Sequence, residues 1–105
     1  MSDKRYRICM YAPLGKRDGI MFIHEAGGKV DGWIEILNQK NAFFGRVSDN
    51  GQIIFSGVIK TLVNTVPYTA TGTVGGGRLL LNMKTASGAY YPVFGEELDT
   101  DDKIL

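Results

Sequence analysis

The sequence predicts an all-β protein of eight short strands, joined in chain order as an antiparallel meander that closes into a small barrel or forms a strongly curved sandwich. Apolar and polar residues alternate with a period of two through most of the 105 residues. Segments rich in glycine or asparagine separate the alternating runs, as turns do between strands. Helical periodicity is scarce, and the one candidate, residues 58–66, has a β-branched content that allows at most a single helical turn.

The first strands follow from alternation and from the breaks between them. In residues 5–11, Tyr6, Ile8 and Met10 share the face expected to point inward. The segment Pro13-Leu14-Gly15 ends this strand, and residues 19–25 form the next, with Phe22 expected to point inward. The following strands are expected at 29–37, 42–48 and 52–60.

Two of the turns between these strands carry specific signals. Gly27 and Gly28 supply the positive φ angles of a tight hairpin. Asn50-Gly51 is the preferred residue pair of a two-residue type I′ hairpin, whereas residues 38–41 predict a turn without such a signal.

The last strands are expected at residues 65–74, 79–83 and 89–96. Pro67 has no N–H to donate, which predicts that its part of the strand lies at an edge or a bulge. A glycine recurs near the middle of the strands, at positions 32, 45, 57, 72 and 95. Because glycine permits a bend or a close approach there, this row favours a curved sheet over a flat one.

Several segments carry a resemblance: Gly32-Trp33-Ile34-Glu35-Ile36-Leu37, Ile59-Lys60-Thr61-Leu62 and Pro67-Tyr68-Thr69-Ala70-Thr71-Gly72. With the Pro-Leu-Gly turn, they make the chain resemble a group of small uncharacterised bacterial all-β proteins over about residues 6–97. The resemblance implies the fold and no activity. The strand count also resembles calycin-like ligand-binding barrels, an analogy of outline alone.

Length and charge indicate a single domain over residues 1–105, with an acidic tail at 98–105 that is expected to be mobile. A net charge of +1 is small for a protein that binds nucleic acid strongly. No apolar run suits a signal peptide or a membrane span, and the lone Cys9 fits a reducing compartment, so we expect a cytoplasmic protein.

The residues with catalytic potential are few. His24 and Cys9 are the only histidine and cysteine, too few for a zinc site of that type, and we expect no cofactor. Alternation predicts that these two side chains lie on opposite faces of the sheet, which argues against a Cys–His dyad. An enzyme that uses His24 with nearby carboxylates (Glu25, Asp31 or Glu35) remains one alternative, although these carboxylates are expected to face outward.

The leading hypothesis is a non-catalytic cytoplasmic binding or interaction domain that self-associates, most simply as a dimer. Trp33 and Tyr11 are large aromatic residues expected opposite the core, and aromatic residues are enriched at interfaces. A bulge near Gly32 would instead turn Trp33 inward. The alternative function is a carrier of a small apolar ligand in a lumen lined by aromatic side chains: Tyr6, Phe22, Phe43, Phe55 and Tyr68.

Overall fold

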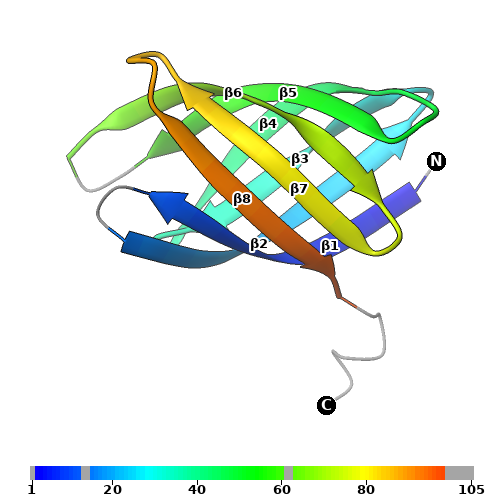
Figure 1. The fold of residues 1–105 in the computed structure, drawn as a ribbon, viewed down its shortest axis with the longest axis horizontal. Coiled ribbons are helices and arrows are strands. Elements are labelled where there is room, and N and C mark those ends of the chain that lie inside the picture. Colours follow the sequence, from blue (N-terminus) through cyan, green and yellow to red (C-terminus); the bar gives the residue numbers. More distant parts are fainter. Residues whose placement is uncertain (1, 13–14, 61–62, 99–105) are drawn as a thin grey trace.

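A computed structural model, which describes residues 2–12, 15–60 and 63–98, forms a closed antiparallel barrel in which each strand pairs with the next (Figure 1). The expected Pro13-Leu14 part of the first turn and the acidic tail beyond Leu98 lie outside the described residues. The strands are β1 (Ser2–Ala12), β2 (Gly15–Ala26), β3 (Lys29–Ile36), β4 (Gln39–Val47), β5 (Gln52–Lys60), β6 (Thr65–Gly75), β7 (Arg78–Thr85) and β8 (Tyr90–Glu97).

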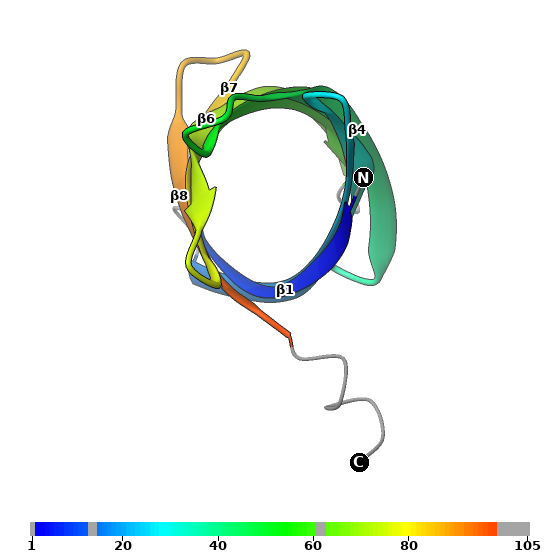
Figure 2. The ribbon, with the colours of Figure 1, turned by 90° about the vertical axis from the view of Figure 1, so that its right-hand side faces the viewer.

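The pairing of β1 with β8 closes the ring and decides between the two predicted architectures. The pairing runs from Tyr6 opposite Glu97 to Met10 opposite Val93. Viewed along its axis, the sheet forms a continuous ring (Figure 2). The predicted eight-stranded meander and its barrel closure are therefore confirmed, and closure leaves the described strands without a free sheet edge.

Several predicted boundaries are wrong. Strand β2 begins at Gly15 rather than at residue 19, because the charged segment Lys16-Arg17-Asp18 pairs with the end of β1. The β3–β4 turn consists of Leu37 and Asn38, both at positive φ, so residues 39–41 belong to β4. The described residues of the helix candidate 58–66 are extended or irregular: residues 58–60 end β5 and residues 65–66 begin β6.

The glycine turns differ from one another in a way that the sequence did not predict. Gly27 and Gly28 both have positive φ, as do Gly76 and Gly77, and each pair forms a two-residue hairpin turn with type I′ dihedral signs.

The Asn50-Gly51 turn is different, because only Gly51 has positive φ. The Gly51 N–H donates to the Ser48 oxygen at 3.0 Å, and the Ser48 N–H donates to the Gln52 oxygen at 2.8 Å. The β4–β5 connection is therefore a three-residue loop built on a type I turn, and the predicted type I′ turn is wrong.

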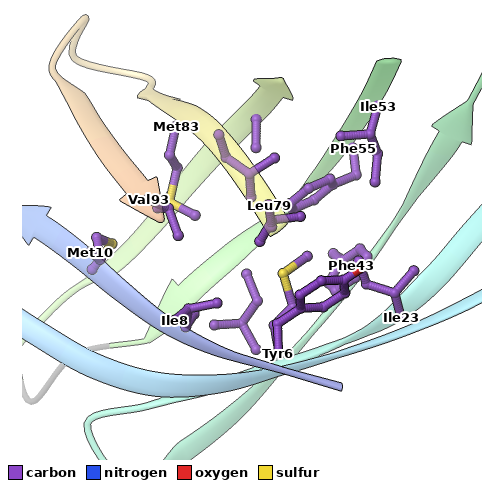
Figure 3. Close-up of a cluster of buried hydrophobic side chains, with 14 of the residues drawn as sticks. Tyr6, Ile8, Met10, Ile23, Phe43, Ile53, Phe55, Leu79, Met83 and Val93 are labelled. Carbon is purple, nitrogen blue, oxygen red and sulfur yellow. The ribbon is translucent and has the colours of Figure 1, made fainter. Parts of the chain in front are cut away.

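The barrel interior is filled by one side-chain face of every strand (Figure 3). Phe43 and Phe55 stand 4.4 Å apart between ring centroids, and Phe55 meets Tyr68 edge to face at 6.0 Å. In β2 the interior residues are Met21 and Ile23, so the predicted inward position of Phe22 is wrong. Both alternating faces of this strand carry apolar residues, and alternation alone does not say which one is buried.

Five strand glycines mark close approaches between neighbouring backbones: Gly19, Gly32, Gly45, Gly57 and Gly72. At Gly32 and Gly72, a Cβ atom would lie far inside van der Waals contact with a carbonyl oxygen of the adjacent strand. These glycines share the interior face of their strands, so the absent Cβ atoms would point into the lumen. The curved sheet that the glycine row favoured is confirmed by the closed barrel.

The two ends of the barrel are distinguished by the connections and strand ends that each carries. The glycine-turn end carries the connections at residues 27–28, 48–51 and 76–77. The other end, here called the cavity end, is where β1, β3, β5 and β7 terminate, at Ala12, Ile36, Lys60 and Thr85.

Candidate functional site

An apolar cavity of about 380 Å³ opens at the cavity end of the barrel. Its volume falls within the roughly 300–1,000 Å³ range of small-molecule sites, which are mostly apolar with a few polar groups. The lining comes from six of the eight strands and one turn: Met10, Ala12, Arg17, Leu37, Ile59, Val66, Tyr68, Met83, Thr85 and Tyr91.

Residue alternation places most of these side chains in the cavity. Val66 precedes Tyr68 by two positions on β6, and Thr85 follows Met83 by two positions on β7, so each pair shares an interior face. The phenylalanine pair Phe43 and Phe55 fills the middle of the lumen, but neither residue lines the cavity. The centre of the barrel is thus packed, and the apolar cavity lies at one end.

Tyr68 is the unusual residue of the cavity lining. Its side chain is 4% exposed, and its hydroxyl oxygen has no hydrogen-bond partner among the described residues. Burial raises the pKa of the Tyr68 phenol well above its ordinary value of 10.0, so the hydroxyl is a proton donor across the physiological range. A buried polar atom without a partner costs about 1–3 kcal/mol, and such atoms are rare in native proteins.

The hydroxyl of the other buried polar residue in the cavity lining, Thr85, is already engaged. Thr85 Oγ1 lies 3.0 Å from Ser87 Oγ and accepts the Ala89 N–H at 3.2 Å, which holds the β7–β8 turn. Just outside the cavity lining, Asn41 is also satisfied: its Nδ2 donates to the Gln39 oxygen at 3.2 Å and its Oδ1 accepts the Lys60 N–H at 3.0 Å. Of the part of the chain that the structure describes, Tyr68 alone has a buried hydroxyl without a partner.

Arg17 brings the one charged side chain of the lining. It stands opposite Met10 in the β1–β2 register and is half-buried, and no carboxylate among the described residues forms an ion pair with it. In the eight-stranded ring, β2 and β6 are four strands apart, so Arg17 and Tyr68 approach the cavity from opposite walls.

The five residues predicted to line a ligand lumen are distributed over the molecule. Tyr68 lines the apolar cavity, and Phe43 and Phe55 belong to the packed centre. Tyr6 points inward near the glycine-turn end, beside a polar hollow of about 310 Å³ that Lys4, Glu25 and Asp49 also line. Phe22 lies outside the barrel, where it stacks on Trp33 at 5.8 Å.

The two residues predicted for an interface do not share a surface. Trp33 points outward on β3, between Phe22 and the Lys40 ammonium, which stands 4.5 Å from the ring centroid. The β2–β3 register is continuous past Gly32, so the alternative of a bulge that turns Trp33 inward is wrong. Tyr11 lies at the far end of β1 and packs edge to face on Phe94 of β8, with centroids 5.6 Å apart.

The histidine and cysteine side chains both point outward, so their predicted placement on opposite faces is wrong. They are nevertheless far apart, because Asp3 stands opposite His24 in the β1–β2 register, whereas Asp18 stands opposite Cys9, six positions along β1. His24 Nδ1 lies 2.5 Å from Asp3 Oδ1 on the convex surface of the barrel. Of the carboxylates weighed with His24, Asp31 stands directly opposite it in the β2–β3 register on the outer face, and Glu35 stands opposite Ile20, four positions along β2. Glu25 faces the lumen at the glycine-turn end, so its predicted outward position is wrong.

Within residues 2–12, 15–60 and 63–98, no cluster of three histidine, cysteine or acidic side chains comes together in the manner of a metal site. Over the same residues, no helix is long and apolar enough to cross a membrane. Comparison of the chain with protein-family models, with curated proteins and with solved structures found no match.

Sequence reasoning missed most of the cavity lining. Arg17 lay outside the predicted strands and Leu37 was expected at the end of a strand, whereas both line the cavity. The available signal was the alternation on β6 and β7. The interior face of β6 includes Val66, two residues before Tyr68, and that of β7 includes Thr85, two residues after Met83. Strand register decides at which end of the lumen the apolar cavity lies, and alternation does not specify the register.

Proposed function

We propose that this protein is a non-catalytic binding domain that takes a small, largely apolar molecule into the cavity at one end of its barrel. The observation that carries the proposal is the cavity of about 380 Å³, whose walls are aliphatic, methionine and tyrosine side chains. An eight-stranded barrel has room for one small ligand when its own side chains leave part of the lumen unfilled. We further propose a cytoplasmic location, which the lone Cys9 supports.

A carrier is favoured over an enzyme by where the reactive groups lie. The His24–Asp3 pair stands on the convex outer wall, with neither residue among those that line the cavity. A catalytic site needs convergent groups around a concave pocket. The cavity lining offers hydroxyls and one guanidinium, which suit orientation of a ligand.

Two matched substitutions on β6 test the proposal. Val66 and Val74 are both half-buried and interior-facing, but Val66 lines the apolar cavity and Val74 lines the hollow at the glycine-turn end. Binding of 2-acetylnaphthalene, a fluorescent apolar probe, is measured by isothermal titration calorimetry on the wild type, Val66→Trp and Val74→Trp. We expect Val66→Trp to abolish binding and Val74→Trp to retain it. No binding to the wild type, or equal loss in both variants, would contradict the proposal.

A second candidate function, self-association, rests on an exposed apolar patch formed by Tyr11, Leu80 and Phe94. Leu80 stands opposite Phe94 in the β7–β8 register, and the three side chains are each about half exposed. These three residues line a shallow groove, which side chains of both charge signs also line: Arg7, Asp18, Arg78 and Glu96. A patch with both signs at its rim suits pairing with an identical patch about a two-fold axis.

Sedimentation velocity distinguishes this surface from the one that Trp33 was predicted to form. We expect a dimer that Phe94→Ser converts to a folded monomer and that Trp33→Ser leaves intact. Ile54→Ser is the control, because Ile54 is 49% exposed on β5, two strands away from β3 and from β7. A monomeric wild type would overturn the candidate, and a dimer lost only in Trp33→Ser would move the interface to β3.

A further inference from the structure

We infer that the ligand of the apolar cavity carries a hydrogen-bond acceptor oxygen, of the ketone, aldehyde or ester kind, that receives the hydroxyl proton of Tyr68. This inference rests on the proposed binding function and adds the chemical class of the ligand. Its basis is the one buried side-chain hydroxyl that the described residues leave without a partner, on a residue that lines the cavity.

No described residue gives the Tyr68 hydroxyl a partner, and its oxygen is enclosed by its neighbours, so a ligand in the cavity reaches it when the Tyr68 side chain or those neighbours shift. On β5 the hydroxyl meets the glycine opposite it: a Cβ atom built on Gly57 would lie 3.0 Å from Tyr68 Oη. Phe55, the neighbour that packs edge to face with the Tyr68 ring, is apolar and has no atom that accepts the hydroxyl proton. The Thr85 hydroxyl, across the β6–β7 ladder, is held by its own turn.

The donor character of Tyr68 and the local lack of charge determine which acceptor suits it. Because burial raises its pKa, the phenol keeps its proton and favours an acceptor over a donor. A carboxylate buried against Tyr68 would be far from Arg17, the only cation of the lining, which stands on the opposite wall. Burying an ion without a paired charge is costly, so a neutral oxygen is the favoured partner.

Two probes of nearly the same shape test the inference, namely 2-acetylnaphthalene and 2-isopropenylnaphthalene. The first has a carbonyl oxygen where the second has a methylene group. Dissociation constants are measured by isothermal titration calorimetry on the wild type, Tyr68→Phe and Tyr6→Phe. Tyr6 is the matched control because it is also a buried tyrosine, but it lies beside the hollow at the glycine-turn end.

We expect the wild type to bind the ketone about fivefold more tightly than the alkene, the difference that one neutral hydrogen bond typically makes. Tyr68→Phe should reduce this preference to none, through weaker ketone binding, and Tyr6→Phe should retain it. Equal wild-type affinities for the two probes would overturn the inference and leave the binding function standing. A preference that survives in Tyr68→Phe would also overturn it. Binding of neither probe would overturn the proposed function as well.

Discussion

The hydroxyl of Tyr68 lies on the lumen side of Gly57. The two residues are directly opposed in the β5–β6 register, and a Cβ atom at position 57 would lie 3.0 Å from Tyr68 Oη. A side chain at position 57 would therefore displace the phenol from its place beside the cavity. The packed centre of the barrel and the cavity meet at this pair, because Phe55 contacts the Tyr68 ring and Ile59 lines the cavity on the same strand.

Tyr68→Phe is expected to stabilise the protein in the absence of ligand. The substitution removes a buried hydroxyl that lacks a partner among the described residues, so the free energy of unfolding should rise by about 1 kcal/mol. Urea denaturation measures the change. Tyr91→Phe, at a half-buried site, should stay within about 0.5 kcal/mol of the wild type. A loss of stability in Tyr68→Phe would mean that the hydroxyl has a partner in solution.

Gly72→Ala is expected to destabilise the barrel by about 1–3 kcal/mol, the range for a group forced into a packed interior. Its Cβ atom would collide with the Leu80 carbonyl oxygen, a backbone atom that moves only if β7 moves. The control is Thr71→Ala on the outward face of the same strand, which should change stability by less than about 0.5 kcal/mol. Equal effects in urea denaturation would refute the close approach of β6 and β7.

The β4–β5 loop should respond unequally to substitution of its two central residues. Gly51→Ala places a side chain at φ 85° and against the Val74 carbonyl oxygen, and should cost about 1 kcal/mol or more. Asn50→Ala should cost less than half as much, because Asn50 does not have positive φ. Similar losses at both positions, measured by thermal unfolding, would indicate a type I′ turn after all.

Alkaline pH is expected to destabilise the fold through Tyr6 and Tyr68. Burial raises the pKa of both phenols above 10.0, and the carboxylates of Glu97 and Glu25 add to the effect at Tyr6. Above pH 10 the unfolded chain loses phenolic protons that the folded chain retains. The stability linked to these groups is thus complete below that pH and lost as the pH rises beyond it.

The size of this alkaline effect should fall in the matched variants. Unfolding free energies of the wild type, Tyr6→Phe and Tyr68→Phe are compared at about pH 8 and about pH 11, on either side of the ordinary tyrosine pKa. Each variant should lose less stability between the two values than the wild type loses. Identical losses in all three proteins would show that other groups, such as lysines, account for the alkaline unfolding.

The sequence was sufficient to predict the eight strands and the barrel, because interior positions such as Val66, Tyr68 and Ala70 alternate with outward threonines and a proline along β6. Pro67 was expected at an edge or a bulge, and it lies just before the β6–β7 pairing in a barrel whose described strands have no free sheet edge. It pairs with Val58 on β5, whereas the β6–β7 pairing begins one residue later, at Tyr68.

The sequence did not predict which face of β2 is buried or where the cavity lies, and the two failures have separate reasons. Ile20 and Phe22 on one side of β2 compete with Met21 and Ile23 on the other, and the pairing with β1 and β3 decides in favour of the second pair. The cavity depends on how far interior side chains from opposite walls reach across the lumen. That reach is a property of the closed ring.

The most direct test of ligand binding in the cavity uses the methionine methyl groups as reporters. Met10 and Met83 line the cavity, whereas Met21 is buried in the barrel without lining it. In protein labelled with ¹³C at the methionine methyls and mixed with 2-acetylnaphthalene, nuclear Overhauser effects to the ligand should appear at Met10 and Met83 and be absent at Met21. Their absence at Met10 and Met83, at a probe concentration that saturates the calorimetric signal, would contradict the proposal that this cavity is the binding site.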